Sequence, residues 1–497
     1  MDEGSLSDTQ RTMVLPLLQE TNIRGKPSIT VSAKGIVNGL SRYPNDGADF
    51  GPDTTLGATA LGQYGSPYTL TTGIQEAVTY SITTAFHSPA AFGAYYVPMD
   101  VVIAPGTYNV NENIVLPSAD QPYQFVLKSA DGFFGQQGIL FGPNVTRGFD
   151  FSNMKSGNVL IQGFAFQQSD YTSTTFSGTY LYLNPSTPAN SLQIHNCGFY
   201  AYSTNPLISI SNYSTVLLTD ISLEPATGST IGTALSFGDN ITSIYITTKV
   251  TINPANPTSL VTFTNSGTIE SFHWINYSDD GVGFGILGSS INRITIDNRI
   301  QSTSGIVVVF NTSDVFTCNM FKMTGGYGNF IFDFNNVPTG SYIDTLVLED
   351  VSLSIGSDFT NLLSNTGIVN NIVLHNISNP TSYTFTQSQP AGSKFGLSGN
   401  IYPSSLTDAP TSGSFTAYYL DSSQYHKKIM LIFNAYENDT ATDQTANIIT
   451  NANNMVVVSN NTGLTVSPGF SGSTMYITVT SPDSTTTYSG IVIIEGY

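Results

Sequence analysis

A short alternation of apolar and variable positions recurs through the middle of the chain, and each copy ends on a residue that is common in turns. The copies are Val159–Gly163, Leu192–Asn196, Val216–Asp220, Ile244–Thr248, Ile294–Asn298, Leu346–Asp350 and Ile372–Asn376. A period of two residues is typical of strands with one buried face, and a longer repeat of about 20 to 30 residues is typical of a solenoid. The pattern predicts a right-handed parallel β-helix in which each copy is a rung of one wall.

A second series of apolar runs alternates with the first along the chain and predicts a second wall. Its members are Leu207–Asn212, Ala234–Asn240, Leu260–Asn265, Ile306–Asn311, Phe330–Asn335 and Leu362–Asn365, with Val282–Gly288 as a step that lacks the final Asn. Asn tolerates the left-handed backbone conformation better than most residues, and stacked Asn side chains can hydrogen-bond to one another. We therefore expect the Asn residues to form the corners between walls.

The composition limits the kinds of partner that the chain can bind. Only 10% of its 497 residues are charged, and the formal net charge is −19 from 15 basic and 34 acidic residues. An average globular domain has about 25% charged residues. This balance argues against a nucleic-acid partner and against insertion into a membrane, and it favours neutral, hydroxyl-rich partners such as glycans.

Neither the cysteines nor the histidines predict a metal site or a cofactor. Cys197 and Cys318 fall several coils apart, which predicts two small buried residues rather than a disulfide. The five histidines are dispersed, and the Cys/His spacing of zinc sites is absent. The sequence shows no export signal and no apolar run near 18 residues, so we expect a virion surface or extracellular protein released without secretion.

The chain divides into four predicted parts. Residues 1–42 form an N-terminal arm, 43–395 the β-helix with its lead-in, 396–413 a linker rich in Pro and Gly, and 414–497 a small antiparallel β-sandwich. The apolar patch Met13–Leu18 suggests that residues 1–30 dock to another subunit or to other virion proteins; a frayed terminus is the alternative. In the last part we expect strands at 414–420, 428–435, 455–459, 475–480 and 490–495.

The lead-in resembles the opening of pectate-lyase-like β-helix proteins, which include viral tailspikes. The resemblance is carried by Asn45–Gly51, a predicted helix Thr72–Val78, the strand Val101–Tyr108 and Ile114–Pro117. It implies a short helix that covers the open end of the β-helix, where strand edges would otherwise pair with another chain. It also implies a homotrimer, since tailspikes are trimeric.

The C-terminal part is similar to modules on attachment proteins of archaeal viruses. The residues in question are Lys427–Asn438, Asn461–Leu464 and Ile491–Tyr497. This resemblance implies a receptor-binding protein on the surface of an archaeal virus.

Paired carboxylates are the best candidate for catalysis, because glycoside hydrolysis needs an acid and a base or nucleophile about 5 to 9.5 Å apart. Asp297 and Glu349 fall in one predicted column, just before the turn, two coils and therefore about 9 to 10 Å apart. The members of that column are predicted as Gln162, His195, Thr219, Thr247, Phe272, Asp297, Asn319, Glu349 and His375. A solvated surface pair is the plainer interpretation.

Other acidic and basic residues give weaker signals. Asp279 and Asp280 precede Gly281, as in an ordinary turn, and Asp350 lies on the turn column. Lyase chemistry would need a basic residue beside an acid cluster that binds calcium. The basic residues of the solenoid lack such a companion in the predicted columns; they are Lys155, Lys249, Arg293, Arg299 and Lys322.

Aromatic residues are candidates for carbohydrate binding, since ring faces stack on sugars while polar edges bond hydroxyls. Those that we single out are Tyr180, Tyr182, Tyr200, Tyr202, Trp274 and Tyr277. The favoured hypothesis is a trimeric virion spike that attaches to a glycan or glycoprotein on the host surface. The alternatives are a glycan-degrading tailspike that uses Asp297 and Glu349, and a structural spike or surface-layer protein that binds nothing specific.

Overall fold

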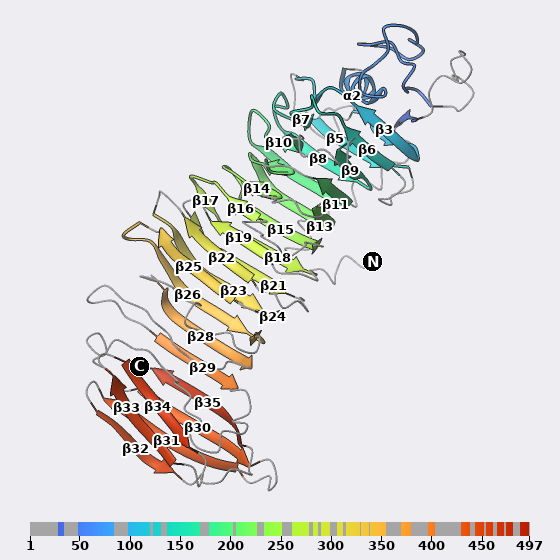
Figure 1. The fold of residues 1–497 in the computed structure, drawn as a ribbon. Helices are drawn as coiled ribbons and strands as arrows, with labels where there is room; N and C mark the ends of the chain where they lie inside the picture. Colours follow the sequence, from blue (N-terminus) through green and yellow to red (C-terminus); the bar gives the residue numbers. More distant parts are fainter. Residues whose placement is uncertain are drawn as a thin grey trace, which may run out of the picture.

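The fold was determined as a computed structural model of the full chain. It describes residues 28–33, 48–83, 98–119, 123–130, 137–168, 178–201, 205–225, 233–250, 261–277, 282–286, 290–298, 306–311, 315–328, 330–336, 338–353, 369–378, 396–402, 429–437, 443–451, 454–460, 465–471, 474–480 and 488–496. Within these residues the chain forms a right-handed parallel β-helix, as predicted. Its coils follow one another from α2 (Ile74–Thr83) at one end to the strands of the last coil at the other (Figure 1).

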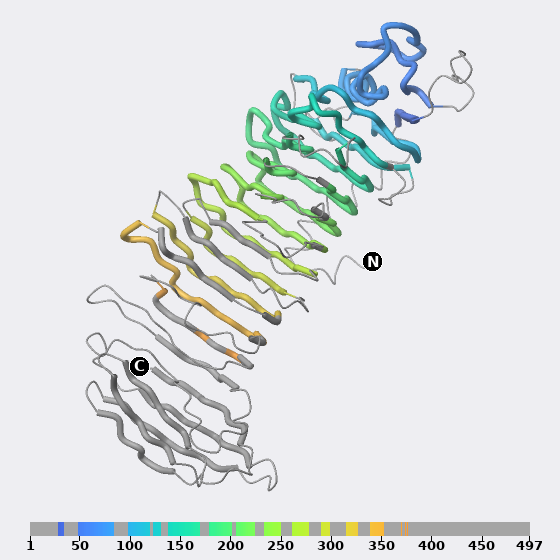
Figure 2. The backbone as a smooth tube through the Cα atoms, viewed as in Figure 1, coloured from blue at the N-terminus to red at the C-terminus, as the bar shows by residue number. Residues whose placement is uncertain are grey.

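The first wall contains the repeated pattern. Its strands pair in parallel in the order β1 (Ser28–Val31), β2 (Asp100–Ile103), β5 (Tyr123–Ser129), β8 (Gly157–Gln162), β11 (Ala189–Ala201), β13 (Tyr213–Pro225), β15 (Ser243–Val250), β18 (Ser271–Asn276), β21 (Arg293–Asn298), β23 (Thr317–Thr324), β26 (Tyr342–Glu349), β28 (Val369–Ser378) and β29 (Gly396–Tyr402). Two short strands, β17 (Thr268–Ile269) and β20 (Ser290–Ile291), lead into it. Figure 2 shows the stacked coils as a backbone trace.

The second series of apolar runs forms the second wall, a nine-stranded parallel sheet. Its strands are β4 (Ile114–Val115), β7 (Arg147–Asp150), β10 (Thr179–Leu183), β12 (Ile208–Ile210), β14 (Leu235–Phe237), β16 (Val261–Phe263), β19 (Val282–Ile286), β22 (Ile306–Asn311) and β25 (Phe330–Asn336). The step without an Asn is β19, as predicted. The run Leu362–Asn365 lies outside the described residues.

A third set of strands follows the corner at the end of the first wall. It consists of β3 (Gly106–Val110), β6 (Gln137–Phe141), β9 (Ala165–Gln168), β24 (Tyr327–Gly328) and β27 (Ser352–Leu353), together with the C-terminal parts of the long strands β11 and β13. Asn196 and Asp220 lie inside those long strands with positive φ, and Asp350 has the same conformation after β26. Asp350 is therefore a corner residue, as predicted.

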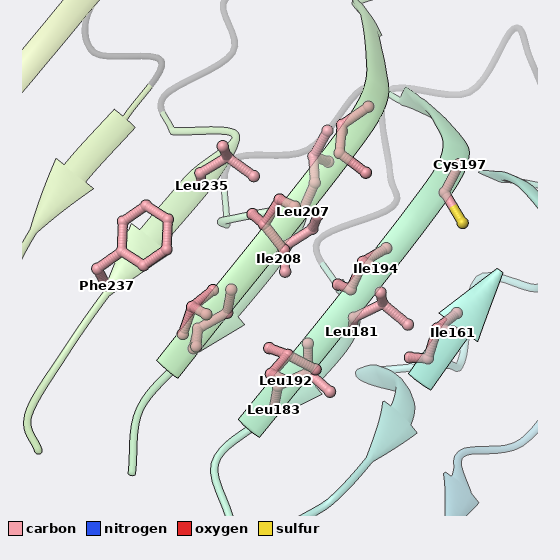
Figure 3. Packing of buried hydrophobic residues seen from close by; sticks show 14 of the residues in the cluster. Ile161, Leu181, Leu183, Leu192, Ile194, Cys197, Leu207, Ile208, Leu235 and Phe237 are labelled. Carbon is pink, nitrogen blue, oxygen red and sulfur yellow. The ribbon is translucent and has the colours of Figure 1, made fainter. Parts of the chain in front are cut away.

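The inward side chains of the first and second walls face each other and form one continuous apolar core. Leu192 and Ile194 from β11 pack against residues of the second wall such as Leu181 and Ile208, all fully buried (Figure 3). Cys197 and Cys318 are free and buried in the same core, as predicted, and burial raises the pKa of each thiol to about 12.

Two corners at the end of the second wall confirm the predicted role of Asn, whereas Asn311 and Asn335 lie within β22 and β25. Asn212 and Asn240 have positive φ, and the Asn240 amide donates to the Asn212 Oδ1 over 2.7 Å. The Asn212 amide in turn donates to Asn184 Oδ1 over 2.7 Å. This ladder ties three successive coils together along the axis.

The N-terminal end of the β-helix is covered as the lead-in predicted. α2 packs against β1, β2 and β4, and the Gln75 side chain exchanges two hydrogen bonds with the backbone of Val115 in β4. Thr72 Oγ1 donates to the Asn109 carbonyl of β3, and β1 pairs with β2. A backbone hydrogen bond between Thr30 and Phe50 covers the outer edge of β1, so the first strand of each wall is covered.

Two segments differ from the predicted domain boundaries. Ser28–Val31, which we assigned to the arm, is β1 of the first wall, and Gly396–Tyr402, which we assigned to the linker, is β29. β29 pairs in parallel with β28 and antiparallel with β35 (Tyr488–Gly496), so it joins the solenoid to the C-terminal strands.

The C-terminal strands are antiparallel, as predicted. β30 (Ile429–Glu437) pairs with β35 and with β31 (Asp443–Asn451), which pairs with β32 (Asn454–Asn460). β33 (Thr465–Ser471) and β34 (Thr474–Thr480) form a separate hairpin. Four predicted strands correspond to β30, β32, β34 and β35, whereas β31 and β33 were not predicted and 414–420 lies outside the described residues. The sandwich packing stays a prediction.

Candidate functional site

The outward face of the first wall is polar along only part of its length. Its central column runs through register partners Leu160, Gln193, Leu217, Tyr245, His273, Thr295, Lys322, Val347 and Val373. Aliphatic side chains occupy both ends of this column, and the aromatic, imidazole and ammonium groups occupy the coils of β15, β18 and β23. These coils are where the first wall can offer directional contacts to a ligand.

An aromatic shelf, formed by Tyr245, His273 and Tyr277, lies in this polar region. The rings of Tyr245 and His273 meet edge to face with centroids 5.0 Å apart. Tyr277 follows β18 and its side chain is 43% exposed. Because the shelf combines a half-buried ring pair with an exposed ring, it offers both a rigid base and a free face.

Asp297 belongs to the same site. Burial raises the pKa of Tyr245 above its ordinary value, and the neighbouring Tyr277, Asp220 and Asp297 add to this effect. Burial lowers the pKa of His273, while Asp297 opposes the shift. Tyr245, His273 and Thr295 are register partners, and Asp297 follows Thr295 by two positions on the same face, so side chains from β15, β18 and β21 lie in one area of the wall.

The column just before the corner has the predicted carboxylates, with two other members corrected. In register order it contains Thr247, Ile275, Asp297, Thr324, Glu349 and His375. Ile275 and Thr324 stand where we predicted Phe272 and Asn319. Asp297 and Glu349 are therefore two coils apart in one column, as expected, with Thr324 between them.

Lys322 forms an ion pair with Glu349, one of the two predicted carboxylates. Its ammonium lies 2.6 Å from Glu349 Oε2, and both side chains are about one-third exposed. The hydrogen bond from Lys322 lowers the pKa of Glu349, and the charges of Lys322 and His375 add to the shift. Glu349 is therefore held ionised, which suits a base or nucleophile and not a proton donor.

Two of the predicted carbohydrate-binding residues are core residues. Trp274 is 2% exposed because its register partners are Ile246 and Ile296, both inward, and its indole N–H donates to Thr248 Oγ1 over 2.7 Å. Tyr180 has no exposed surface; its ring stacks on Phe141 and its hydroxyl donates to the Tyr200 carbonyl over 2.6 Å. A ring without an exposed face cannot stack on a sugar.

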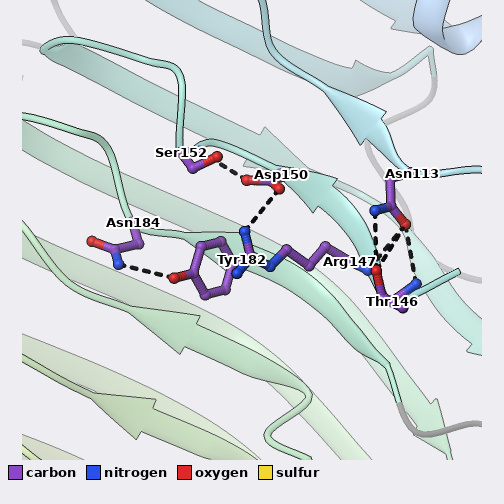
Figure 4. Close-up of polar contacts among 7 residues, drawn as sticks. All are labelled: Asn113, Thr146, Arg147, Asp150, Ser152, Tyr182 and Asn184. Atoms are coloured by element: carbon purple, nitrogen blue, oxygen red, sulfur yellow. Dashed lines mark hydrogen bonds and ion pairs between the residues drawn. The ribbon is translucent and has the colours of Figure 1, made fainter.

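The other predicted tyrosines on the early coils lie away from the shelf. Tyr182 is half-buried on the second wall, where the Arg147 guanidinium covers one ring face at 3.7 Å (Figure 4). Arg147 is itself paired with Asp150 over 3.0 Å, and the Asn184 amide donates to the Tyr182 hydroxyl. Tyr200 is half-buried in the third set of strands, and Tyr202 lies outside the described residues, as do Asp279 and Asp280.

His195, on β11, lies at the N-terminal end of the site. Its Nε2 lies 3.2 Å from Gln193 Oε1, which can only accept, so Nε2 carries the proton and Nδ1 accepts from the Thr219 hydroxyl. Burial lowers the pKa of His195, although Asp220 opposes the shift. The imidazole is therefore neutral at pH 7 and fixed between two coils.

The sequence contained signals that would have placed this site more accurately. Phe272–Asn276 and Phe321–Gly325 both repeat the alternation that ends on a turn residue, so they are two further rungs. Aligning them would have turned Trp274 inward and Lys322 outward. Tyr245 stands between the inward Ile244 and Ile246 of a predicted rung, which places its side chain on the outward face.

Within the described residues, no group of three or more His, Cys, Asp or Glu side chains is arranged to hold a metal ion. In the same part of the chain, no helix has the length and apolar character needed to cross a membrane.

Comparisons with known proteins identify no family. No family model matches the chain, and neither does any curated protein. Two solved structures are similar to it, both with low sequence identity and a low TM-score. The tailspike protein of the Acinetobacter baumannii bacteriophage Fri1, described as a capsular polysaccharide depolymerase, shares 10% identity with a TM-score of 0.20, over 81% of this chain and 80% of its own. The Acinetobacter phage vB_ApiP_P1 tailspike protein shares 11% with a TM-score of 0.29, over 96% and 91%. At these TM-scores neither likeness bears on the activity of this chain.

Proposed function

We propose that the chain is a spike on the surface of a virus particle that binds host glycan through the aromatic shelf and Asp297. Tyrosine faces stack on the C–H faces of sugars, and a neighbouring carboxylate accepts hydrogen bonds from hydroxyls. The convergence of Tyr245, His273, Tyr277 and Asp297 from adjacent coils is the observation that carries this proposal. Isolated surface aromatics would be expected to scatter over the face.

The assembly around this site is also proposed. The resemblance of the lead-in to tailspikes supports a virion location and a homotrimer, and the C-terminal resemblance supports a virus of archaea. The part of the N-terminal arm that precedes β1, apart from the segment Met13–Leu18, would contact other virion proteins. The excess of acidic residues supports a partner other than nucleic acid or an anionic membrane surface.

Binding of polysaccharide from host envelopes to the shelf variants tests the proposal. Tyr277→Ala should weaken binding about tenfold, because one aromatic contact contributes about 1 to 1.5 kcal/mol. Tyr342→Ala is the matched control, since Tyr342 is 37% exposed on a later coil of the same wall. If Tyr245→Ala and Tyr277→Ala bound the polysaccharide as tightly as wild type, the aromatic shelf would not be the binding site.

A glycan-cleaving activity is the second candidate, favoured by the shared column of Asp297 and Glu349. Their separation of two coils, about 9 to 10 Å along the axis, is near the upper limit for an inverting pair. With Glu349 held ionised by Lys322, Glu349 would be the base and Asp297 the acid. Asp297→Asn and Glu349→Gln should each lower the release of reducing ends at least about a hundredfold.

The third candidate function is a structural spike that binds no specific partner. An array of glycans from host envelopes separates the three functions in one measurement. Binding without product supports attachment, product release supports the hydrolase, and the absence of both would leave only a structural role.

A further inference from the structure

The loop that covers the N-terminal end of the β-helix exposes apolar side chains. We call residues 54–70 the cap loop. Among the described residues, seven large hydrophobic side chains are exposed, and four of them lie in this loop: Leu56, Leu61, Tyr68 and Leu70, at 39 to 47%. The other three are spread over the solenoid. No residue from Thr54 to Gln75 is charged.

The cap loop has a defined conformation. Thr55 bridges to Tyr68, and the Leu56 amide donates to the Pro67 carbonyl over 2.7 Å, which places Leu56 beside Tyr68. The Leu70 carbonyl accepts from the Asn111 amide at the end of β3. The apolar side chains are therefore held in place on the outside of the loop.

A buried carboxylate anchors the loop to α2. Glu76 is 2% exposed, and its oxygens accept from the Gly57 amide over 3.2 Å and from the Thr69 hydroxyl over 2.7 Å. Glu76 lies in the first turn of α2 and so connects the loop directly to the start of the helix. Such an ordered uncharged surface is typical of a docking site.

We propose that the apolar segment Met13–Leu18 of the same chain docks on the cap loop. The segment has five apolar residues and one proline, and no residue from Thr12 to Gln19 is charged. Both surfaces are thus uncharged and apolar, so their contact removes apolar area from water without burying a charge.

The connection between the two segments is short enough to favour this occupant. Only nine residues separate Leu18 from Ser28, and an extended chain of that length reaches about 30 Å. β1 is also bound to the segment that leads into the cap loop, because Thr30 and Asp49 exchange hydrogen bonds of 2.8 Å. With so short a tether, the effective concentration of the segment at the cap loop is about millimolar. A separate protein would have to exceed this concentration to compete for the loop.

Disulfide trapping in the full-length protein tests the docking. In the double variant Leu15→Cys/Leu61→Cys, mild oxidation should give an intramolecular disulfide, identified by peptide mass spectrometry. Leu15→Cys/Val315→Cys is the matched control, because Val315 is 46% exposed but lies on a middle coil. We expect the first pair to form at least about ten times faster than the control pair. The native Cys197 and Cys318 are buried and do not interfere.

Each other outcome contradicts the proposal. Equal rates in the two variants, or no disulfide, would show that the segment does not rest on the cap loop. A disulfide between two chains would show that a second copy occupies it. As an independent measurement, Leu15→Ser/Leu17→Ser should raise the binding of a hydrophobic dye, and this rise should disappear when Leu56 and Leu61 are also changed to Ser. A dye signal that does not depend on Leu56 and Leu61 would overturn the docking.

Discussion

Lys322 and Glu349 form an ion pair of 2.6 Å across two adjacent coils of the first wall. This pair lies next to Thr324, the residue that separates Asp297 from Glu349 in their common column. Because Lys322 holds Glu349 in its ionised form, the two carboxylates of the column are not equivalent. Any ligand that spans both carboxylates also meets the ammonium group.

Replacement of Lys322 should release Glu349 from this constraint. In Lys322→Met, the pKa of Glu349 should rise toward its ordinary value of 4.5, because the first cause of its lowering is the hydrogen bond from Lys322. NMR titration of carbon-labelled glutamate side chains measures the change. Arg293→Met, on a neighbouring strand of the same face, is the control and should leave the titration of Glu349 unaltered. If the Glu349 titration were the same in Lys322→Met, the ion pair would not form in solution.

The lowered pKa values of His195 and His273 predict a loss of stability in mild acid. An unfolded His binds protons below about 6.5, whereas burial disfavours the charged form of these two imidazoles in the folded protein. Unfolding therefore becomes more favourable as the pH falls below 6.5, and the loss is complete below the lowered pKa values. Their stabilising effect is fully present above pH 6.5.

Denaturant unfolding at several pH values checks this expectation. The midpoint of wild type should fall between pH 6.5 and 5, and the double variant His195→Gln/His273→Gln should show a flatter profile over the same interval. The exposed His375 provides the control substitution. If the pH profile of His375→Gln were as flat as that of the double variant, the loss of stability would not be due to His195 and His273.

The sequence was sufficient to predict the solenoid, because each rung repeats an alternation that only a half-buried strand explains. The sequence was not sufficient to predict which residues share a column, because the coils differ in length. Phe272 pairs with Ile294, 22 positions later, while Ile294 pairs with Phe321, 27 positions later. A constant period therefore slips, as it did at Phe272 and Asn319. The contact of Lys322 with Glu349 depends on this register.

The register of β18 also decides the roles of two neighbouring aromatic residues. Trp274 is an inward residue of β18, and Tyr277 lies three positions later on the surface. Trp274→Ala should lower the free energy of unfolding by about 3 to 5 kcal/mol, because it leaves a large cavity between Ile246 and Ile296. Tyr277→Ala should change it by no more than about 0.5 kcal/mol.

Urea unfolding followed by circular dichroism compares these variants at one protein concentration. The glycan-binding assay gives the complementary result, because Tyr277→Ala should lose affinity while remaining as stable as wild type. A stable Trp274→Ala protein would contradict the inward register of β18.

Gln75 shows how the end of the solenoid is protected. Its side chain accepts from the Val115 amide over 2.6 Å and donates to the Val115 carbonyl over 2.9 Å, so it takes the place of a neighbouring strand at the edge of β4. Gln75→Ala leaves both backbone groups without these partners, at about 1 to 3 kcal/mol for each group that water does not reach. It also opens the edge of the second wall to pairing with another chain.

Gln63→Ala is the matched control for this variant, since Gln63 also accepts from backbone amides, those of Thr59 and Ala60, but in an exposed turn. We expect Gln75→Ala to unfold at lower urea concentration and to form higher oligomers at micromolar concentration, as measured by light scattering, while Gln63→Ala resembles wild type. If both variants lost the same stability and neither associated, the edge of β4 would not depend on Gln75, and the cap would act through the apolar contacts of α2 alone.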